Sequence, residues 1–481
     1  MRPVRRTRVL LGGVLVASAL VACGTTEQAA PPSAGSSTAA SVRASSVAAT
    51  PSPSAATAPS APPASVTPVT PVTVATPPQT EAAPAQPPSA PVPPGGLVTS
   101  DDLAQAGTAI AAMTVNDLAG TVIMASSADA VGTDLVSRLH LGGVILMGSK
   151  GAIDGTDGGT PAQVKALTDQ LQSQVPTSQN GAPLLIATDQ EYGLVTRLVN
   201  GFTDFPGSTE LSQISDTSAA AEATRSVTEA GGQELRAVGI NVDFAPDADV
   251  LPDSGPSGVD DRTFGSDPVR AGTLVAAAVQ GYQQGGVAAT IKHFPGIGRL
   301  ATDTHKALPS LDVSCDEWNT VEAVPMRAGV DAGVAMVMTG HIELPAVGAS
   351  GESSALSSAV VTDLLRGPGR DGCNGLNFHG VAVSDSFQMA PVVNNFGPAE
   401  AAWRGVAAGQ DLVLMPQDPS AAVSGIVAAV ADGSLPEARL REAATTVYAL
   451  RLALARSPQP GLDVVNSDEH QAIADRARQA G

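Results

Sequence analysis

The most informative segment for the architecture is Val287-Ala288-Ala289-Thr290-Ile291-Lys292-His293-Phe294-Pro295-Gly296-Ile297-Gly298. It begins as a short apolar, β-branched run, and seven similar runs occur elsewhere along the chain. Each run is a candidate strand, and continuous apolar strands are typical of a parallel sheet that is buried on both faces. The eight runs cover residues 120–125, 142–147, 183–188, 239–245, 288–292, 334–339, 380–384 and 411–415.

Alanine-rich stretches separate these runs, with apolar residues at every third or fourth position, which predicts amphipathic helices. They cover residues 161–175, 219–238, 268–284, 357–365 and 399–408. Eight strand–helix units predict a closed (β/α)8 barrel of the TIM type, as a single domain over residues 98–481. Residues 419–455 predict two further helices on the outside of the barrel. The competing architecture is an open doubly wound sheet, but no GxGxxG follows the first strand, so we expect no dinucleotide site.

The first 97 residues differ in composition from the rest and predict export. Four arginines precede an apolar core over residues 9–20, as in a secretory signal peptide, here residues 1–22. Leu20-Val21-Ala22-Cys23 resembles a bacterial lipobox, in which Cys23 becomes an acylated N-terminus; the alternative is an ordinary signal peptide with an incidental cysteine. Residues 23–97 are rich in Ala, Pro, Ser and Thr and predict a disordered tether. We expect an exported protein that is lipid-anchored to the outer face of the cell membrane.

Charge and cysteine content limit the partners. Residues 1–22 hold four arginines and no acidic residue, so their removal would change the net charge from −20 to −24. Such a charge disfavours nucleic acid and anionic lipid, so membrane attachment would depend on acyl chains. Cys315 and Cys373 remain as a pair, and we expect a disulfide, with two separate buried thiols as the alternative. No CxxC or HExxH spacing occurs, and we expect no metal and no cofactor.

Charged residues and histidines gather where five consecutive predicted strands end. The carboxyl ends of barrel strands share one face, which is where active sites lie. Two interpretations stay open for Asp243 and Asp247, because an aspartate after a strand is also a common helix N-cap. Asp385 directly follows a buried strand and is the stronger candidate. The residues at the strand ends are Asp189, Glu191, Asp243, Asp247, Lys292, His293, His341 and Asp385.

Acid–base work on an uncharged, hydroxyl-rich substrate fits this set of residues. Glycoside cleavage needs a proton donor to the leaving oxygen and a carboxylate on the other face of the sugar. Asp385 is the candidate carboxylate, and His305 is the candidate donor because an imidazole titrates near neutral pH. Asp303 would orient that imidazole and stabilise its charged form. The alternative for His305 is a loop histidine exposed to solvent.

Six short segments carry a resemblance to a known family. They are Asp189-Gln190-Glu191, Asn241-Val242-Asp243-Phe244-Ala245-Pro246, Asp261-Arg262-Thr263-Phe264-Gly265, Lys292-His293-Phe294-Pro295-Gly296-Ile297-Gly298, Asp303-Thr304-His305 and Ser384-Asp385. Over about residues 120–415 the chain resembles the β-N-acetylglucosaminidase branch of glycoside hydrolase family 3. The KHFPGxG segment followed by Asp-Ser/Thr-His is the signature specific to this branch.

The resemblance implies roles for individual residues. Asp385 would be the nucleophile that forms a covalent glycosyl-enzyme, so that the anomeric configuration is retained. His305, paired with Asp303, would be the acid/base on a mobile loop, consistent with the low-bulk segment 296–304. The residues implied to hold the sugar hydroxyls and the acetamido group are Asp189, Arg197, Arg262, Lys292 and His293.

Three positions depart from the family pattern. The family usually has Asp-Gln-Glu-Gly-Gly-Arg-Val-x-Arg, whereas this chain has Tyr192 for the first glycine and Leu194 for the first arginine. Ile297 replaces a frequent histidine. The first two changes predict an altered shape of the sugar pocket or of its entrance.

The activity implied is that of an exo-acting, retaining β-N-acetylglucosaminidase that releases terminal N-acetylglucosamine. With its anchor and tether, the chain resembles actinobacterial cell-wall lipoproteins, which implies peptidoglycan fragments (N-acetylglucosamine β-linked to N-acetylmuramic acid) as the amino-sugar glycan. Chitooligosaccharides are the second possibility. The alternatives are a β-glucosidase or a phosphorolytic enzyme of the same family, and a non-catalytic wall-binding lipoprotein.

Overall fold

The computed structural model describes residues 96–156, 158–176 and 182–481. The predicted signal peptide, Cys23 and all but the last two residues of the predicted tether lie outside these ranges. Within the described ranges, no helix is both long enough and apolar enough to cross a bilayer.

Eight parallel strands form the centre of the fold. The first seven strands pair in chain order, and the first strand also pairs with the eighth. A bridge between Val383 and Leu412 links the seventh strand to the eighth and closes the ring. Each strand overlaps one of the predicted runs, and the predicted (β/α)8 barrel is confirmed. The strands are β1 (Ile123–Ser126), β2 (Gly143–Ile145), β5 (Leu185–Thr188), β8 (Val242–Asp243), β9 (Ala288–Phe294), β10 (Met336–Thr339), β13 (Val381–Ser384) and β14 (Val413–Leu414).

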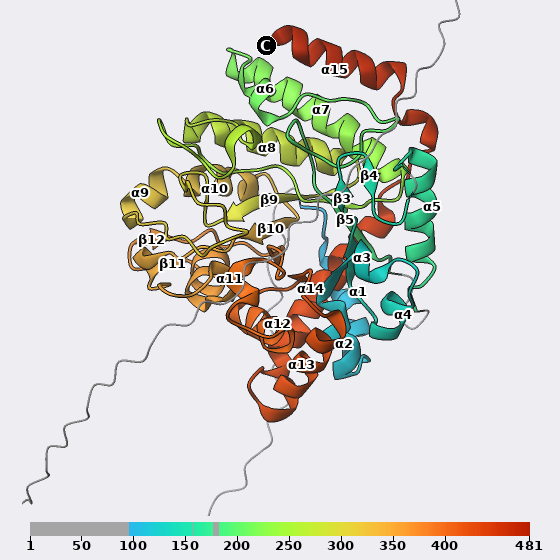
Figure 1. Ribbon diagram of the computed structural model, residues 1–481, viewed down its shortest axis with the longest axis vertical. Helices are drawn as coiled ribbons and strands as arrows, with labels where there is room; N and C mark the ends of the chain where they lie inside the picture. The colour runs from blue at the N-terminus through green and yellow to red at the C-terminus, as the bar shows by residue number, and fades with distance from the viewer. Residues whose placement is uncertain (1–95, 157, 177–181) are drawn as a thin grey trace, which may run out of the picture. The chain divides into compact units, whose positions relative to one another are not determined.

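Helices surround the strands (Figure 1). The main ones are α5 (Pro161–Gln172), α7 (Thr217–Ala237), α8 (Pro268–Gln284), α10 (Ala323–Asp331) and α12 (Pro398–Ala408). Local sequence explains where α8 begins. The Asp267 carboxylate accepts the N–H groups of Val269 and Arg270, and Pro268 occupies the first turn, where no N–H is needed.

The remaining elements are short or lie outside the repeating units. The segment predicted as a helix over residues 357–365 is a π-helix, η5 (Ala359–Arg366). The other helices are α1 (Ser100–Ala111), α2 (Val115–Thr121), α3 (Ser127–Ala130), α4 (Leu135–Leu139), α6 (Ser208–Ser212), α9 (Cys315–Thr320), α11 (Ala390–Val393), α13 (Pro419–Asp432), α14 (Glu437–Arg456) and α15 (Asp468–Ala480). Single turns are η2 (Asp260–Arg262), η3 (Pro345–Val347), η4 (Ser354–Leu356) and η6 (Leu462–Val464). Three small hairpins pair β3 (Gly148–Ser149) with β4 (Ala152–Ile153), β6 (Gln190–Tyr192) with β7 (Val195–Thr196), and β11 (Gly369–Arg370) with β12 (Cys373–Asn374).

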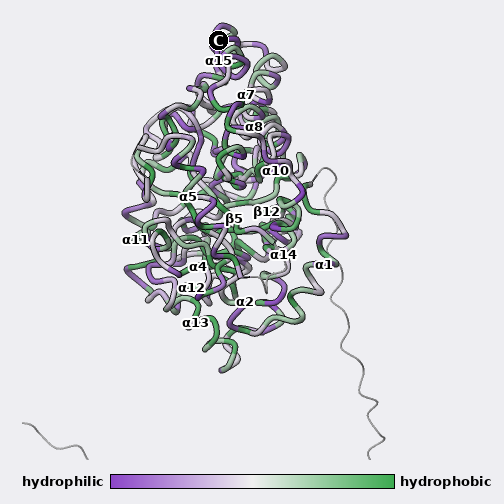
Figure 2. Tube along the Cα trace, turned by 90° about the vertical axis from the view of Figure 1, so that its right-hand side faces the viewer, coloured by the Kyte–Doolittle hydropathy of each residue, from purple (hydrophilic) through white to green (hydrophobic). Residues whose placement is uncertain are grey.

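The helix α14 closes the amino-terminal end of the barrel. Its residues Val447, Leu450 and Leu454 belong to the same apolar cluster as the side chains that fill the barrel interior. Arg451 donates hydrogen bonds to the carbonyls of Ala182 and Pro183, just before β5. The sequence predicted two helices outside the barrel, and α14 lies across one of its ends. Figure 2 shows hydrophobic residues where β5 runs and more hydrophilic ones in the peripheral α15.

A disulfide joins Cys315 at the start of α9 to Cys373 in β12. The two cysteines are 58 residues apart in the sequence. The bridge therefore ties the segment before α10 to the hairpin that precedes β13.

Candidate active site

The ammonium group of Lys292, near the carboxyl end of β9, lies between two carboxylates. Its Nζ lies 2.6 Å from Oε1 of Glu191 and 3.0 Å from Oδ1 of Asp189. Asp189 and Glu191 come two residues apart after β5, so their side chains project to the same side. Burial alone would lower the pKa of Lys292, but the two carboxylates raise it above its usual value. Lys292 therefore stays charged.

Arg262, at the end of the turn η2, forms the second cationic contact of the site. Its Nε and Nη2 each lie 2.8 Å from a carboxylate oxygen of Glu191 in a bidentate pair. Burial alone would raise the pKa of Glu191, but Lys292 and Arg262 lower it to about 2. The sequence placed Glu191 at a strand end without a role of its own, and the structure shows that it links the two predicted sugar-holding cations.

Arg197 reaches the same network from the hairpin of β6 and β7. Its Nη2 lies 3.3 Å from Oδ2 of Asp189, and its Nη1 donates to the carbonyl of Gly148 at 3.1 Å. The side chain of Gln190 accepts the N–H groups of Arg197 and Leu198, which holds the hairpin closed. All five predicted sugar-holding residues therefore lie in one connected group, since His293 Nε2 is 3.4 Å from Nη2 of Arg262.

Asp385 follows β13 directly. Its N–H donates to the carbonyl of Thr339 in β10, and its Oδ1 accepts the N–H of Ser386 at 2.7 Å. Burial alone would raise the pKa of Asp385, but the positive charges that His293 and His341 can carry, together with the Ser386 N–H, lower it below its usual value. The carboxylate is therefore anionic near neutral pH, which is the state that a nucleophile requires.

His341, one of the predicted strand-end residues, fixes the turn after Asp385. Its Nε2 lies 3.0 Å from the carbonyl of Ser386, and its Nδ1 lies 2.8 Å from Oγ of Ser353. Burial lowers the pKa of this fully buried histidine. Both nitrogens of this neutral ring are hydrogen-bonded, so we assign His341 a supporting role in the site.

The His305–Asp303 pair lies on the loop after β9. His305 Nδ1 is 2.9 Å from Oδ1 of Asp303, and the N–H of His305 donates to the same oxygen. The ammonium group of Lys306, 2.9 Å from Oδ2, and the His305 donors hold the pKa of Asp303 far below its usual range. The carbonyl of His305 accepts the N–H of Ala390 in α11, which ties the loop to the segment after Asp385.

Hydrogen bonds hold the stem of this loop, which forms the first part of the segment that the resemblance implies to be mobile. Ile297 N–H donates to Oδ1 of Asp249 at 2.6 Å, and Ser257 Oγ donates to the carbonyl of Gly298 at 2.7 Å. A Cβ atom at Gly298 would lie 2.3 Å from the carbonyl oxygen of Val250, so only glycine fits there. The absence of a side chain at Gly298 therefore allows its backbone to pack closely against that of Val250. Exposure begins only at Ala301.

Asp247 and Asp249 lie next to the imidazole ring of His293. Neither Asp243 nor Asp247 caps a helix: Asp243 accepts the N–H of Gln190, and Asp247 accepts the N–H of Asp249. Burial raises the pKa of Asp247 to about 7 and, as the largest effect, that of Asp249 to about 6. Asp249 was missed in the sequence, where its spacing of two from Asp247 was the available signal.

Asp247, Asp249 and His293 offer ligand atoms within 4.8 Å of one another, a grouping that has the donor chemistry of a metal site. Arg262 already places a cation against it, with Nη2 3.6 Å from Oδ2 of Asp247. The guanidinium therefore offsets part of the negative charge of the two carboxylates.

Tyr192 does not project into the sugar pocket, although an altered pocket shape was one of the two expectations for this position. Its side chain is 7% exposed and turns into the core, where the ring lies edge-on to Phe205 with centroids 5.3 Å apart. Leu194, in contrast, is 65% exposed at the tip of the β6–β7 hairpin. Of the two departures, Leu194 is the one that changes an exposed surface.

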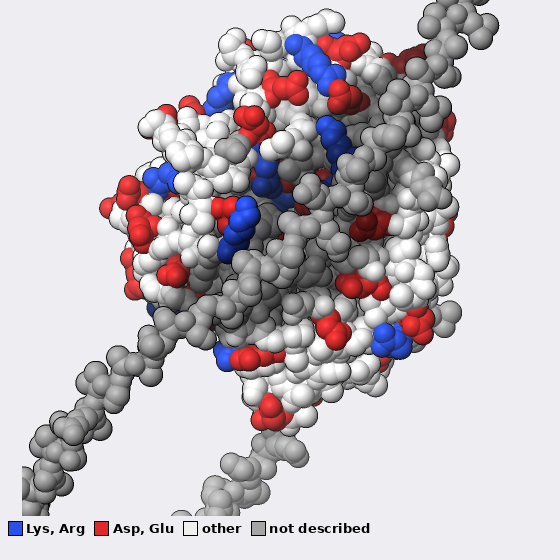
Figure 3. All heavy atoms as spheres, viewed as in Figure 1, with Lys and Arg blue, Asp and Glu red and all other residues white. Residues whose placement is uncertain are grey.

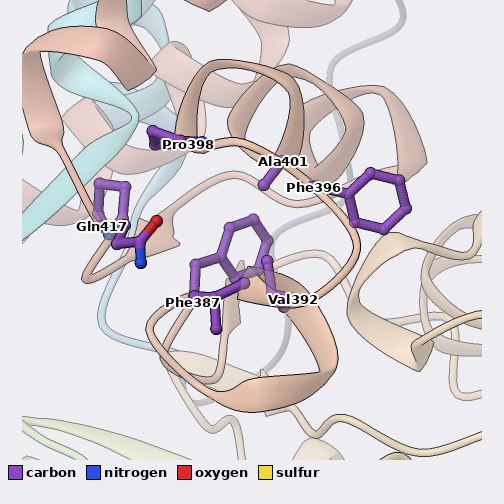
Figure 4. A pocket seen from close by; sticks show the side chains of 8 residues that line it. Phe387, Val392, Phe396, Pro398, Ala401 and Gln417 are labelled. Atoms are coloured by element: carbon purple, nitrogen blue, oxygen red, sulfur yellow. The ribbon is translucent and has the colours of Figure 1, made fainter. Parts of the chain in front are cut away.

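The surface shows two further features, a mixed distribution of charge and a small pocket. Acidic and basic side chains are interspersed on the face shown in Figure 3. A small pocket between the segment after β13 and α12 has mostly apolar walls and no charged residue, so it offers no group for acid–base chemistry (Figure 4). Its lining includes Phe387, Val392, Phe396, Pro398, Ala401 and Gln417.

Comparisons with known proteins agree with this geometry. A family model described as glycosyl hydrolase family 3 N terminal domain matches residues 109–450. Beta-hexosaminidase A of Pseudoalteromonas piscicida is 34% identical over 296 residues, which are 59% of this chain and 47% of that protein. Beta-hexosaminidase LpqI of Mycobacterium tuberculosis is 31% identical over 335 residues, 68% of this chain and 78% of that protein.

A solved structure shows the same fold. The family 3 β-N-acetylglucosaminidase from Paenibacillus sp. str. FPU-7 superposes with a TM-score of 0.67 at 33% identity, covering 77% of this chain and 69% of that one. The chain spans about half the length of the Pseudoalteromonas relative and most of the mycobacterial one.

Proposed function

The chain belongs to glycoside hydrolase family 3, and on this basis we propose that it is an exo-acting, retaining β-N-acetylglucosaminidase. The observation that carries the proposal is one arrangement at the strand ends. A partly buried anionic carboxylate, Asp385, lies near an exposed imidazole, His305, whose charge contributes to lowering the pKa of that carboxylate. A nucleophile and a proton carrier are the two parts that retaining hydrolysis needs.

Two steps follow from this arrangement. In the first, a carboxylate oxygen of Asp385 bonds to the anomeric carbon while the bond from that carbon to the leaving oxygen breaks. His305 gives its proton to the leaving oxygen, and Asp303 stabilises and orients the ring. In the second step a water loses a proton to His305 and its oxygen bonds to the anomeric carbon. The bond to Asp385 breaks, which restores both residues and the original configuration.

The charged network around Lys292 would bind the sugar hydroxyls. Asp189 and Arg197 are partly exposed, whereas Lys292 is almost fully buried. The buried ion pairs hold these side chains in fixed positions before substrate arrives, which reduces the cost of ordering them on binding. Arg262 and His293 form the opposite end of the same network.

Peptidoglycan fragments ending in N-acetylglucosamine are the proposed substrate, with chitooligosaccharides as the second candidate. Residues 1–23 support this choice, because a signal peptide with a lipobox-like end would place the enzyme on the outer face of the membrane, beside the wall. The partners are then the glycan and, through acylated Cys23, the membrane. Two relatives carry the name beta-hexosaminidase, which supports an amino-sugar substrate.

Comparison of turnover on aryl β-N-acetylglucosaminide and aryl β-glucoside tests the proposal. We expect the N-acetylglucosaminide to be the better substrate, and a higher rate on the glucoside would replace the proposal with a β-glucosidase. The same assay with and without phosphate, followed by product identification, separates hydrolysis from phosphorolysis. Absence of turnover on all of these substrates would favour a non-catalytic wall-binding lipoprotein.

A further inference from the structure

Asp249 is fully buried and accepts three hydrogen bonds with two carboxylate oxygens. Its Oδ1 accepts the N–H of Ile297 at 2.6 Å. Its Oδ2 lies 3.3 Å from the backbone N and 2.8 Å from Nδ1 of His293. An asparagine would offer a single acceptor oxygen and would turn its NH2 group toward one of these donors. A carboxylate fits this place and an amide does not.

The contact with Asp249 decides which nitrogen of His293 is free. Nδ1 must donate toward a carboxylate, so the neutral ring keeps its lone pair on Nε2. Burial, with Arg262 next in size, lowers the pKa of His293 to about 4, so the ring is neutral in the working range. The unprotonated Nε2 lies 3.4 Å from Nη2 of Arg262, a contact long enough for a closer donor to take over its single lone pair. A sugar hydroxyl at this position would therefore act as a donor.

The same carboxylate also holds the base of the catalytic loop. Ile297 lies four residues after His293 and begins the anchored stem, and Asp303 and His305 follow on the exposed part. A shift of Asp249 would move His293 and the stem of the loop together. A misplacement of about 1 Å in a catalytic constellation can cost on the order of 100-fold in rate.

We propose that Asp249 is a positioning residue that fixes His293 as a hydrogen-bond acceptor for the sugar and joins it to the stem of the loop that carries His305. The inference rests on the proposed glycosidase function. It assigns Asp249 no contact with substrate.

Asp247 provides a matched control in the same cluster. Its Oδ1 accepts the N–H of Asp249 at 2.9 Å, and its Oδ2 faces Arg262. Asp247→Asn can keep the first bond and leaves all three donors on Asp249 in place. A more distant control is Asp411, a buried carboxylate that accepts from Arg439 at 2.8 Å and precedes β14, at the other end of the barrel.

A double-mutant cycle tests the proposal, with kcat/KM on aryl β-N-acetylglucosaminide as the readout. We expect Asp249→Asn to lower kcat/KM about 100-fold in the unsubstituted chain and about 10-fold or less in a His293→Ala background, where only the contact with the loop stem at Ile297 is left to lose. Asp247→Asn should cost less than Asp249→Asn. Asp411→Asn should cost the same factor in both backgrounds.

Full multiplication of the Asp249→Asn and His293→Ala losses would overturn the proposal, since a merely structural carboxylate behaves like Asp411. If Asp249→Asn does not fold, the ¹⁵N shifts of the imidazole nitrogens in the unsubstituted protein decide. The chain has six histidines, so the His293 signals can be assigned with a His293→Gln variant. We expect a protonated Nδ1 and a bare Nε2, and the opposite tautomer contradicts the proposal. If the unsubstituted chain shows no turnover, the proposed glycosidase function is wrong. That result is obtained before the cycle is measured and is distinct from a failure of the Asp249 proposal.

Discussion

His305 Nδ1 lies 2.9 Å from Oδ1 of Asp303, and the side chain of His305 is 72% exposed. The pair is therefore exposed to solvent, although the stem of its loop is buried. Asp303 is tied to Lys306 and His305, which keeps its pKa far below the usual range, so it remains an anion at every pH at which the enzyme would work. An anion beside the imidazole supports its protonated form when it has to donate.

His305→Ala should lower kcat on 4-nitrophenyl β-N-acetylglucosaminide by about 10²- to 10⁴-fold, the usual contribution of a general acid. On the 2,4-dinitrophenyl glycoside the loss of the bond-breaking rate should be much smaller, because that leaving group departs without a proton. Steady-state and burst kinetics on both substrates measure the two losses. His379→Ala, at an exposed histidine before β13, is the control and should be silent. Equal losses in bond breaking on both leaving groups would remove His305 from the acid role.

Lys292→Ala should destabilise the fold and abolish substrate binding. It leaves Asp189 and Glu191 without the cation that lies 3.0 and 2.6 Å from them. Removing one member of a buried ion pair costs about 3–5 kcal/mol, measured here as the free energy of urea unfolding. Lys165→Ala removes the partner of the exposed Asp169 and should change that free energy by less than about 0.5 kcal/mol. Similar values for both variants would contradict the buried network.

The ionisation of Asp247 should lower the free energy of unfolding as pH rises from about 4 to about 7. Its pKa in the fold is raised to about 7 by burial and by Asp249, against about 3.9 in an unfolded chain. The folded protein then holds a proton that the unfolded chain has lost, so the stabilisation is present below pH 4 and lost through pH 7. Glu191, lowered to about 2, has the opposite sign, and its contribution is lost as pH falls from about 4 toward 2.

Urea unfolding at pH 4.5 and pH 7.5 measures this difference. Asp247→Asn should show a smaller decrease in unfolding free energy between the two pH values than the unsubstituted chain does. Asp204→Asn, at a side chain that is 92% exposed, should follow the unsubstituted chain. An unchanged slope in Asp247→Asn would show that Asp247 is ionised throughout.

The disulfide between Cys315 and Cys373 should contribute stability and little to catalysis. It closes a loop of 58 residues, for which the chain-entropy model gives about 4 kcal/mol. The paired variant Cys315→Ser/Cys373→Ser should lose about 2–4 kcal/mol of unfolding free energy and keep its kcat at 25 °C. Reduction of the unsubstituted chain with dithiothreitol should reproduce the loss. A paired variant as stable as the oxidised chain would show that the bridge has no such role.

The barrel could be predicted from sequence because each strand is a local apolar run, and the order of a (β/α)8 barrel follows the order of the chain. The face that carries Asp189, Lys292 and Asp385 followed from the same rule. The pairing of Asp249 with His293 could not be predicted, because it spans 44 residues and depends on how the segment after β8 folds back. No local pattern encodes that path.

Tyr192 shows a second limit. A large residue in place of a glycine predicted a changed pocket, but the side chain found room beside Phe205 and Gly231 in the core. Its backbone has φ 62°, a conformation that glycine adopts more easily. Side-chain direction in such a turn follows from the backbone, and the residue type alone does not determine it.

In the proposed mechanism Asp385 forms a covalent bond to the sugar. A 5-fluoro derivative of N-acetylglucosaminyl fluoride tests it, because the ring fluorine slows both steps while the good leaving group keeps the first step the faster one. Asp385→Ala should lose on the order of 10⁴-fold or more in turnover and should not be labelled, whereas His305→Ala should still be labelled.

The deciding measurement is the intact mass of the protein after this treatment, followed by peptide mapping. We predict one added glycosyl unit, located on Asp385. An unlabelled protein that nevertheless turns over the N-acetylglucosaminide, or a label on any other residue, would contradict the covalent route through Asp385.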